Sequence, residues 1–255
     1  MKADSLKELL AWKPPYQESI ISGGLLLPGT RLIMFGAEET WKTMLCIHTG
    51  FAIATGNSWF SIHTSPHRVL FIQCELSKAL LRDRVAKYCN SKEVLPDNIY
   101  FCTEFDLRID STYGLAALDG LIATIQPRVL ILDPLYKIFS GHVSDEYDVK
   151  KLTNNLDYLI QRYNLAVIIT HHTRKSQLVE GRPIPGYGSE EMLGSRILPA
   201  WVDSAIWIEK VDGSESSPED IIKLSFTKAR NAIYRLHPIN IRIDRDKLAF
   251  SLQVK

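Results

Sequence analysis

The chain has 255 residues, a formal net charge of +1 and a hydrophobic content of 45%. This hydrophobic content is ample for a buried core and is not that of a disordered chain. A charge balance so close to zero also excludes a global attraction to nucleic acid or membrane, so any polyanion site must be a local patch. At this length we expect one large domain or two small ones.

Cysteine usage and hydropathy indicate the compartment. Cys46, Cys74, Cys89 and Cys102 are well separated and form no C-x-x-C pair. Three of them lie in or beside apolar runs, which is typical of buried thiols in a reducing compartment. The sequence shows no signal peptide, and no apolar run approaches the roughly 18 residues that a membrane span needs. These features predict a soluble, cytoplasmic protein with no membrane partner.

The first residues read as a lead-in segment. Ser5 and Glu8 have the spacing of a capping box for a short helix over SLKELLAW. The Pro14-Pro15 pair then interrupts any helix. We expect residues 1–22 to form a linker that packs on a neighbour, and residues 23–255 to form a single domain.

Apolar, β-branched runs alternate with helical segments along the middle of the chain. We expect strands at 32–35, 69–72, 98–103, 128–133 and 165–170, and helices at 42–55, 77–90, 114–125 and 145–163. This alternation predicts an α/β fold whose mostly parallel central sheet is covered by helices on both faces. From Trp201 onward, four short runs predict C-terminal antiparallel strands that extend the sheet: SAIWIEK, IIKLSFTKAR, PINIRI and LAFSLQ.

The segment GAEETWKT follows the first strand and opens the first helix. It fits the phosphate-binding pattern G-x-x-x-x-G-K-[ST] except at Trp41, where the second glycine belongs. Backbone N–H groups of such a loop form an anion cradle with the helix N-terminus, and Lys42 adds a mobile positive charge. The hydroxyl of Thr43 can hold Mg²⁺, which prefers oxygen ligands. We therefore expect a nucleotide-phosphate site at Gly36, Thr40, Trp41, Lys42, Thr43 and Met44.

Trp41 leaves two interpretations open. If its φ is positive, a bulky residue costs about 1–2 kcal/mol there and its side chain could obstruct the phosphates. If its φ is negative, the backbone cradle survives and the side chain points outward. Because Lys42 and Thr43 are retained together with the carboxylates Glu75 and Asp133, we expect an active site.

Polar residues end three of the expected strands. Asp133 ends VLILD, at an edge where doubly wound sheets gather ligands, and can orient Mg²⁺; alternatively it caps the turn at Pro134. Glu75 suits a general base that orients water, or else an acid stabilised by a helix N-terminus. Of His171 and His172, one can contact a γ-phosphate while the other packs, because successive strand residues face opposite ways. We expect His171 to be the sensor.

This order of residues resembles the RecA/DnaB superfamily of ring-forming ATPases, related to KaiC, and most closely the RepA-like hexameric replicative helicase group. The resemblance covers about residues 20–235. The matching segments are Glu75-Leu-Ser with Leu81 and Arg84 (E-M-S…L-x-x-R), Asp133-Pro134-Leu135 (D-P-L), His171 to Lys175 (H-H-T-R-K) and Lys228 to Asn231 (K-x-R-N). It implies a RecA-like P-loop NTPase fold, ATP and Mg²⁺ as cofactors, and a homo-oligomeric, hexameric ring.

The resemblance also assigns Lys228 and Arg230 to a finger that reaches the γ-phosphate bound to a neighbouring subunit. A planar guanidinium pairs bidentately with phosphate and stays charged, so this role is chemically reasonable. The alternative is that Lys228 and Arg230 line the solvated face of an edge strand, since they alternate correctly for that.

A long glycine- and proline-rich segment follows the two histidines, TRKSQLVEGRPIPGYGSEEMLGS. In the family, the matching loop faces the central channel and touches single-stranded nucleic acid. Basic residues with an interleaved aromatic suit that contact, because every base offers a stacking face. The resemblance therefore implies nucleic-acid contacts by Arg174, Lys175, Arg182 and Tyr187.

The function expected from these features is an ATP-hydrolysing, ring-forming motor that acts on single-stranded DNA, a RepA-like replicative DNA helicase. Two alternatives stay open. In the first, Trp41 abolishes turnover and the chain is a nucleotide-gated DNA-binding or assembly protein. In the second, the ATPase serves recombination mediation or plasmid control without unwinding.

Overall fold

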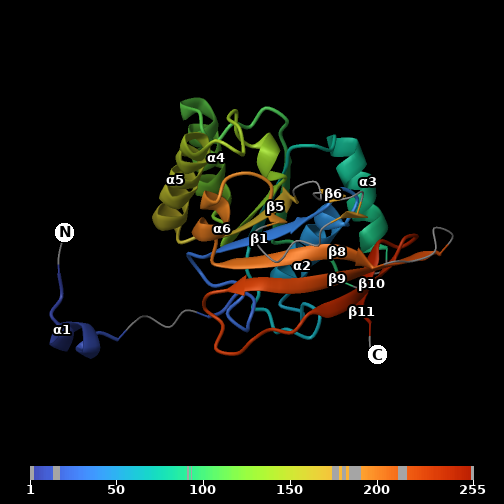
Figure 1. Ribbon diagram of the computed structural model, residues 1–255, viewed down its shortest axis with the longest axis horizontal. Coiled ribbons are helices and arrows are strands. Elements are labelled where there is room, and N and C mark those ends of the chain that lie inside the picture. The colour runs from blue at the N-terminus through green and yellow to red at the C-terminus, as the bar shows by residue number, and fades with distance from the viewer. Residues whose placement is uncertain are drawn as a thin grey trace.

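A central β-sheet organises the computed structural model, which describes residues 3–13, 18–90, 92, 94–173, 178–179, 182–183, 191–211 and 217–253 (Figure 1). Within these residues the main sheet has nine strands in the order β11-β10-β9-β8-β1-β5-β4-β2-β3. They are β1 (Arg31–Gly36), β2 (Val69–Gln73), β3 (Ile99–Thr103), β4 (Val129–Asp133), β5 (Ala166–His172), β8 (Ser204–Val211), β9 (Glu219–Ala229), β10 (Ile239–Asp244) and β11 (Ala249–Leu252). A separate two-stranded sheet pairs β6 (Leu178–Val179) with β7 (Arg182–Pro183).

The sheet changes direction between β8 and β9. Strands β3, β2, β4, β5, β1 and β8 run parallel, whereas β9, β10 and β11 continue the sheet in antiparallel fashion. The predicted mostly parallel sheet with antiparallel C-terminal strands is therefore confirmed. The first of the four expected C-terminal strands, β8, is the exception, because it pairs in parallel with β1.

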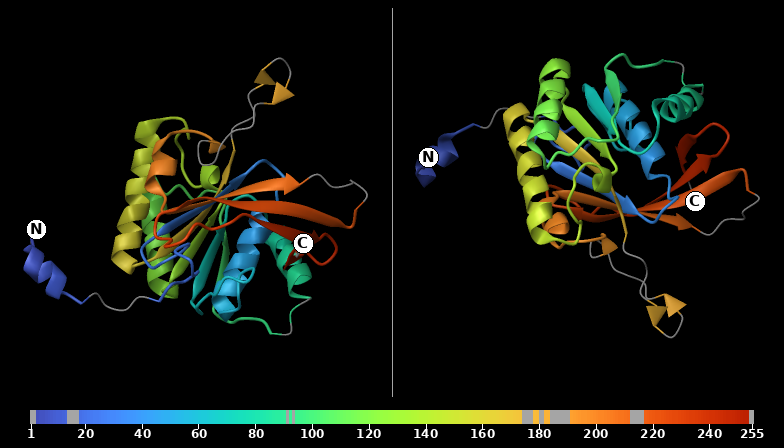
Figure 2. Two further views of the ribbon diagram at one scale, coloured as in Figure 1. Left: turned by 60° about the horizontal axis from the view of Figure 1, so that its bottom comes forward. Right: turned by 90° about the horizontal axis from the view of Figure 1, so that it is seen from above.

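Helices cover both faces of the sheet, as predicted (Figure 2). They are α2 (Lys42–Thr55), α3 (Lys78–Cys89), α4 (Thr112–Ile125), α5 (Glu146–Tyr163) and the short α6 (Ile197–Trp201). Alternate residues of β4 show how the core divides. Val129 and Ile131 join the cluster that contains α2, whereas Leu130 and Leu132 join the cluster that contains α4 and α5. This alternation follows from the two-residue period of a strand.

Side-chain caps fix where the helices begin. The hydroxyl of Ser77 accepts a hydrogen bond from Leu80 N at the start of α3, and Asp145 caps α5 in the same way. Helix α4 begins at Thr112, two residues before the expected Gly114, because the Ser111 hydroxyl accepts from the N–H of Gly114 at 3.0 Å. A serine N-cap satisfies one of the N–H groups that lack an intrahelical partner.

The N-terminal helix α1 (Leu6–Ala11) stands away from the sheet (Figure 1). Its predicted capping box is present, since Ser5 and Glu8 each bond to the other's backbone. No residue of α1 is buried. The core instead begins at Ile20 and Ile21, which are fully buried, so the packed domain starts slightly before the boundary expected at residue 23.

In the part of the chain that the structure describes, none of the helices combines the length and the apolar character required to cross a membrane.

Candidate nucleotide site

The phosphate-loop segment joins β1 to α2 at the carboxyl edge of the sheet. Its first residue, Gly36, lies against β8. A Cβ at this position would meet the carbonyl oxygen of Ile208 at 2.5 Å and the hydroxyl of Thr40 at 2.8 Å. A glycine is therefore required by close packing. The Thr40 hydroxyl donates to the carbonyl of Ala37 at 2.8 Å, which closes the loop on itself.

Lys42 lies at the N-terminus of α2 with its ammonium group inside the loop. It donates to the carbonyl oxygens of Gly36, at 3.1 Å, and of Ala37. Burial lowers the pKa of Lys42, while the charges of Asp133, Glu38 and Glu75 act in the opposite direction. The lysine charge and the free N–H groups of the helix end together favour an anion at this position.

Trp41 adopts the left-handed conformation, with φ of 65° and ψ of 15°. The first of the two interpretations therefore holds for the backbone. The side chain is anchored to β9, because the indole Nε1 donates to Asp220 Oδ2 at 2.9 Å. The indole also forms part of the wall of the adjoining cleft.

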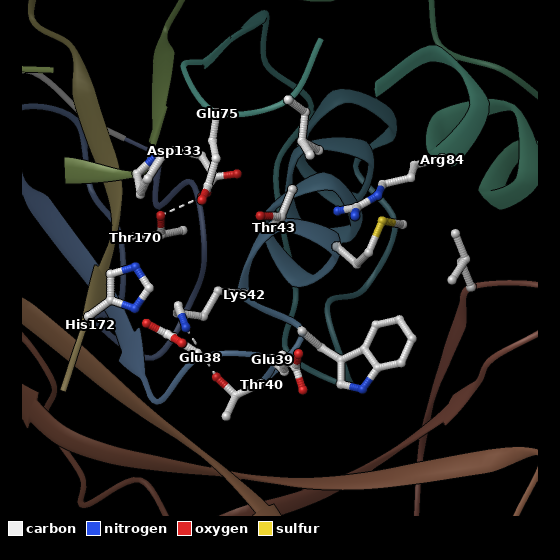
Figure 3. A pocket seen from close by; sticks show the side chains of 15 residues that line it. Glu38, Glu39, Thr40, Lys42, Thr43, Glu75, Arg84, Asp133, Thr170 and His172 are labelled. Atoms are coloured by element: carbon white, nitrogen blue, oxygen red, sulfur yellow. Dashed lines mark hydrogen bonds between the residues drawn. The ribbon is translucent and has the colours of Figure 1, made fainter. Parts of the chain in front are cut away.

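The cleft next to the loop has a volume of about 620 Å³, within the range of small-molecule sites. The parallel register brings the strand ends together, since Gly36 pairs with His172 and Gln73 pairs with Asp133. The side chains of Lys42, Thr43, Glu75, Asp133 and His172 line one space (Figure 3). The other lining residues are Glu38, Glu39, Thr40, Trp41, Met44, Leu76, Arg84, Pro134, Thr170 and Leu248.

Asp133 is 2% exposed and accepts hydrogen bonds from two side chains. They are the amide of Gln73, at 2.8 Å, and the hydroxyl of Thr170, at 2.5 Å. Burial raises the pKa of Asp133, and the neighbouring polar side chains of Thr170, Thr43 and Gln73 oppose that shift by stabilising the carboxylate. Within the described residues no group of three or more His, Cys, Asp and Glu side chains could hold a metal ion.

Thr43 and Asp133, which both line the cleft, nevertheless fit Mg²⁺ in a nucleotide site. Mg²⁺ takes hard oxygen ligands, keeps several waters, and is usually held by one or two carboxylates together with substrate phosphates. A hydroxyl and a carboxylate beside a phosphate loop meet that requirement. The two residues that the sequence predicted as metal ligands are thus adjacent in space.

Glu75 is held by two groups that sequence reasoning missed. The hydroxyl of Tyr136 donates to Glu75 Oε1 at 2.9 Å. The carbonyl oxygen of the Gln73 side chain accepts from the backbone N–H of Glu75, at 2.6 Å, and of Leu76, at 3.2 Å. The same Gln73 amide donates to Asp133. Gln73 therefore links the predicted metal ligand to the segment that carries the predicted base.

The structure turns His172, not His171, toward the cleft. His172 is half-buried, lines the cleft and lies against Tyr136, with ring centroids 5.3 Å apart. His171 is fully buried, its Nε2 bonds to the carbonyl of Leu193 at 2.7 Å, and burial lowers its pKa to about 4. The expectation for His171 is corrected accordingly. Alternation predicted that only one histidine faces the site, but not which one.

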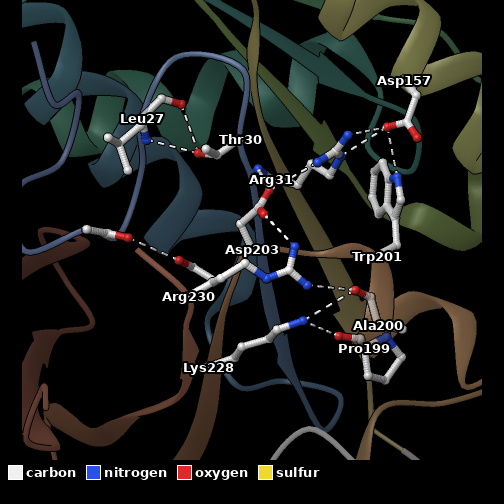
Figure 4. Close-up of polar contacts among 12 residues, drawn as sticks. Leu27, Thr30, Arg31, Asp157, Pro199, Ala200, Trp201, Asp203, Lys228 and Arg230 are labelled. Atoms are coloured by element: carbon white, nitrogen blue, oxygen red, sulfur yellow. Dashed lines mark hydrogen bonds and ion pairs between the residues drawn. The ribbon is translucent and has the colours of Figure 1, made fainter. Parts of the chain in front are cut away.

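Lys228 and Arg230 lie beside Asp203, at the end of the sheet where β1 and β8 begin (Figure 4). Lys228 pairs with Ala205 near the start of β8, whereas the phosphate loop follows the far end of β1. The length of β1 separates these ends, roughly 15–20 Å. In its own chain, Arg230 contacts Asp203 Oδ1 at 3.2 Å and Lys228 donates to the carbonyl of Pro199 at 2.7 Å. They cannot contact the phosphate loop of their own subunit.

The predicted nucleic-acid contacts fall outside the described residues. This applies to Arg174, Lys175 and Tyr187 and to the side chain of Arg182. Their assignment stays a prediction from the resemblance.

Replacing Gln73 by leucine is expected to lower kcat for ATP hydrolysis by about 10- to 100-fold, the usual effect of losing a side chain that orients a metal ligand. The Mg²⁺ concentration that gives half-maximal rate should rise, because Asp133 loses a hydrogen bond. Steady-state rates across a Mg²⁺ titration measure both quantities. The exposed Gln161→Leu variant on α5 is the control and should change neither. An unchanged Mg²⁺ requirement in Gln73→Leu would show that Gln73 serves packing alone.

The AAA domain family model matches residues 2–177, and the chain therefore belongs to the AAA domain family. Its structural neighbours show the fold. One is an ATPase domain that is 12% identical with a TM-score of 0.66, over 88% of this chain and 84% of that chain. A DnaB-like replicative helicase is 12% identical with a TM-score of 0.67, over 88% of this chain and 57% of that chain.

A KaiC-like protein from Pyrococcus horikoshii OT3 is 12% identical with a TM-score of 0.62, over 94% of this chain and 100% of that chain. No curated protein sequence matches this chain. The likeness to these structures confirms the predicted RecA-like P-loop ATPase fold of the RecA/DnaB type. This chain spans little more than half of the DnaB-like helicase.

Proposed function

We propose that this chain binds Mg-ATP in the cleft beside the phosphate loop and hydrolyses it. The observation that carries this proposal is the convergence of Lys42, Thr43, Asp133 and Glu75 at one edge of the sheet. They supply the groups that phosphoryl transfer needs, namely a cation, oxygen ligands for a metal and a carboxylate base. In such reactions catalysis is almost entirely positioning and electrostatic stabilisation, so placement of these groups counts for more than their reactivity.

The proposed roles follow from the contacts. Lys42 and the N-terminus of α2 bind the phosphates, and Thr43 and Asp133 hold Mg²⁺, which neutralises charge that develops on the phosphates. Glu75 takes a proton from the attacking water. The hydroxyl of Tyr136 holds the Glu75 carboxylate in place. His172 lines the same cleft, and we assign it the γ-phosphate sensor role.

We further propose that the chain assembles head to tail into a ring, with a hexamer as the expected size. Support comes from the position of Lys228 and Arg230, at the edge of the sheet farthest from the phosphate loop of their own chain. A heterologous interface joins opposite edges of neighbouring subunits and closes into a ring when the rotation permits. In this arrangement Arg230 would reach the phosphates bound to the neighbour.

The partner of the ring is proposed to be single-stranded DNA. The neighbours include a protein described as a DnaB-like replicative helicase, and the segment after His172 carries Arg174, Lys175, Arg182 and Tyr187. The second candidate function is a nucleotide-gated assembly protein without turnover. The left-handed Trp41 within the phosphate loop favours that alternative.

Steady-state phosphate release with Mg-ATP, with and without single-stranded DNA, is expected to show a basal rate that rises severalfold on adding DNA. Lys42→Ala should abolish release, because the phosphates lose their principal cation. Lys150→Ala, on the far helix α5, is the matched control and should behave as wild type. Measurable ATP binding without release in either condition would favour the assembly protein. Full activity of Lys42→Ala would refute the site itself.

A further inference from the structure

The lining of the cleft combines two kinds of side chain. The polar ones include Thr40, Lys42, Thr43 and Asp133. The apolar ones include Trp41, Met44, Leu76 and Leu248. A phosphate loop explains the first group, and the second group can contact a part of a ligand that is flat and apolar. The inference below rests on the proposed function, namely that a nucleotide occupies this cleft.

A hydrogen bond at the outer edge of the indole ring holds Trp41 in a fixed orientation. Its Nε1 donates to Asp220 Oδ2 at 2.9 Å, and Asp220 is itself bonded to Arg245 at 2.7 Å and lies 3.7 Å from Lys210. Hydrogen bonds from Arg245 and Trp41 lower the pKa of Asp220, so the anchor is ionised at neutral pH. With its N–H group satisfied, the indole offers only its apolar ring to the cleft.

The backbone gives a second reason to look for a role of the side chain. Trp41 has φ of 65°, a conformation that glycine adopts freely and bulky residues rarely do. The indole is also only partly buried, and it lines the cleft. A residue that is strained, anchored and partly exposed beside a ligand site is well placed to contact the ligand.

We propose that the indole of Trp41 is a stacking platform for the nucleobase of the bound nucleotide. The tryptophan then replaces the glycine of the phosphate-binding pattern and adds a base-binding surface to the loop itself. Stacking on an aromatic ring tolerates any base, since each has a π-face. The platform is preorganised, because the bond to Asp220 fixes the ring before a ligand arrives.

The test compares a nucleotide with its phosphate part alone, by titration calorimetry with Mg-ATP and with Mg-tripolyphosphate. Trp41→Gly restores the usual glycine, and it is expected to weaken ATP binding by roughly tenfold or more while tripolyphosphate binding stays unchanged. Trp41→Phe keeps a ring and should retain most of the affinity for ATP. Asp220→Asn weakens the anchor and should give an intermediate loss.

Trp207→Phe is the matched control, because Trp207 stacks on Phe35 on the other side of the loop and does not line this cleft. It should change neither dissociation constant. Tighter ATP binding by Trp41→Gly would mean that the indole obstructs the site, and equal losses for both ligands would mean that it only shapes the loop. Either result overturns the proposal. If wild type binds neither ligand, the proposed function fails as well, so the two failures are distinguishable.

Discussion

The Glu75→Gln variant is expected to lose about 10²- to 10⁴-fold in kcat for ATP hydrolysis, the contribution that a positioned general base commonly makes. Its dissociation constant for Mg-ATP should stay within a few-fold of wild type. The glutamine oxygen can still accept from Tyr136, and the backbone N–H can still donate to Gln73, so the segment keeps its place. What the variant lacks is a carboxylate that can take a proton.

Two measurements separate chemistry from binding in this variant. Phosphate release gives kcat, and calorimetry with Mg-ATP gives the dissociation constant. The matched control is Glu104→Gln, an exposed glutamate that directly follows the neighbouring strand β3 and does not line the cleft. It should leave both quantities unchanged. Undiminished turnover by Glu75→Gln would show that Glu75 is not the general base. Its role would then be that of an acid stabilised by a helix N-terminus.

The Arg230→Ala variant is expected to lose about 10³- to 10⁵-fold in kcat, the effect of removing an arginine that stabilises phosphoryl transfer from a neighbouring subunit. Nucleotide affinity should change little, because Arg230 lies far from the loop of its own chain. Stability should also change little. The Arg230 side chain is 54% exposed, and its buried partner Asp203 keeps the hydrogen bonds that it accepts from the backbone N–H and the guanidinium of Arg31, so no buried charge is left unpaired.

A mixing experiment tests whether Arg230 acts in trans. Arg230→Ala subunits keep an intact phosphate loop, and Lys42→Ala subunits keep an intact Arg230. Mixed assemblies should regain part of the activity that each variant lacks alone. The control Arg242→Ala removes an arginine on β10 that pairs with Glu219, and it should stay active without mixing. If mixing restores nothing while Arg230→Ala alone remains active, Lys228 and Arg230 are only surface residues at the end of β9.

The strands that position the site could be predicted because their signals are local. The run VLILD ends at Asp133 in the sequence and in β4, and the capping serines fix the helix starts to within two residues. Parallel pairing then brings the strand ends to one edge, as it does in any such sheet. The meeting of Lys42, Thr43, Asp133 and Glu75 follows from these local signals and the topology.

Other features depend on tertiary contacts that carry no local signal. The choice of His172 over His171 depends on which face of β5 meets the loop, and alternation is the same for either choice. The indole of Trp41 is anchored by Asp220, which lies 179 residues away in sequence. Gln73 was visible as a polar residue at the end of an apolar strand. Its hydrogen bond to Asp133, however, appears only once β2 pairs with β4.

The close packing of Gly36 on β8 has a mechanical consequence. The loop abuts Ile208 in the middle of β8 and is tied through Trp41 to Asp220 near the start of β9. Lys228 and Arg230 lie at the other end of β9, about 25 Å from Asp220 along the strand. We expect β8 and β9 to move together as a rigid unit when the nucleotide bound to their own subunit changes. In the proposed ring, events at successive nucleotide sites would then be coupled through these strands.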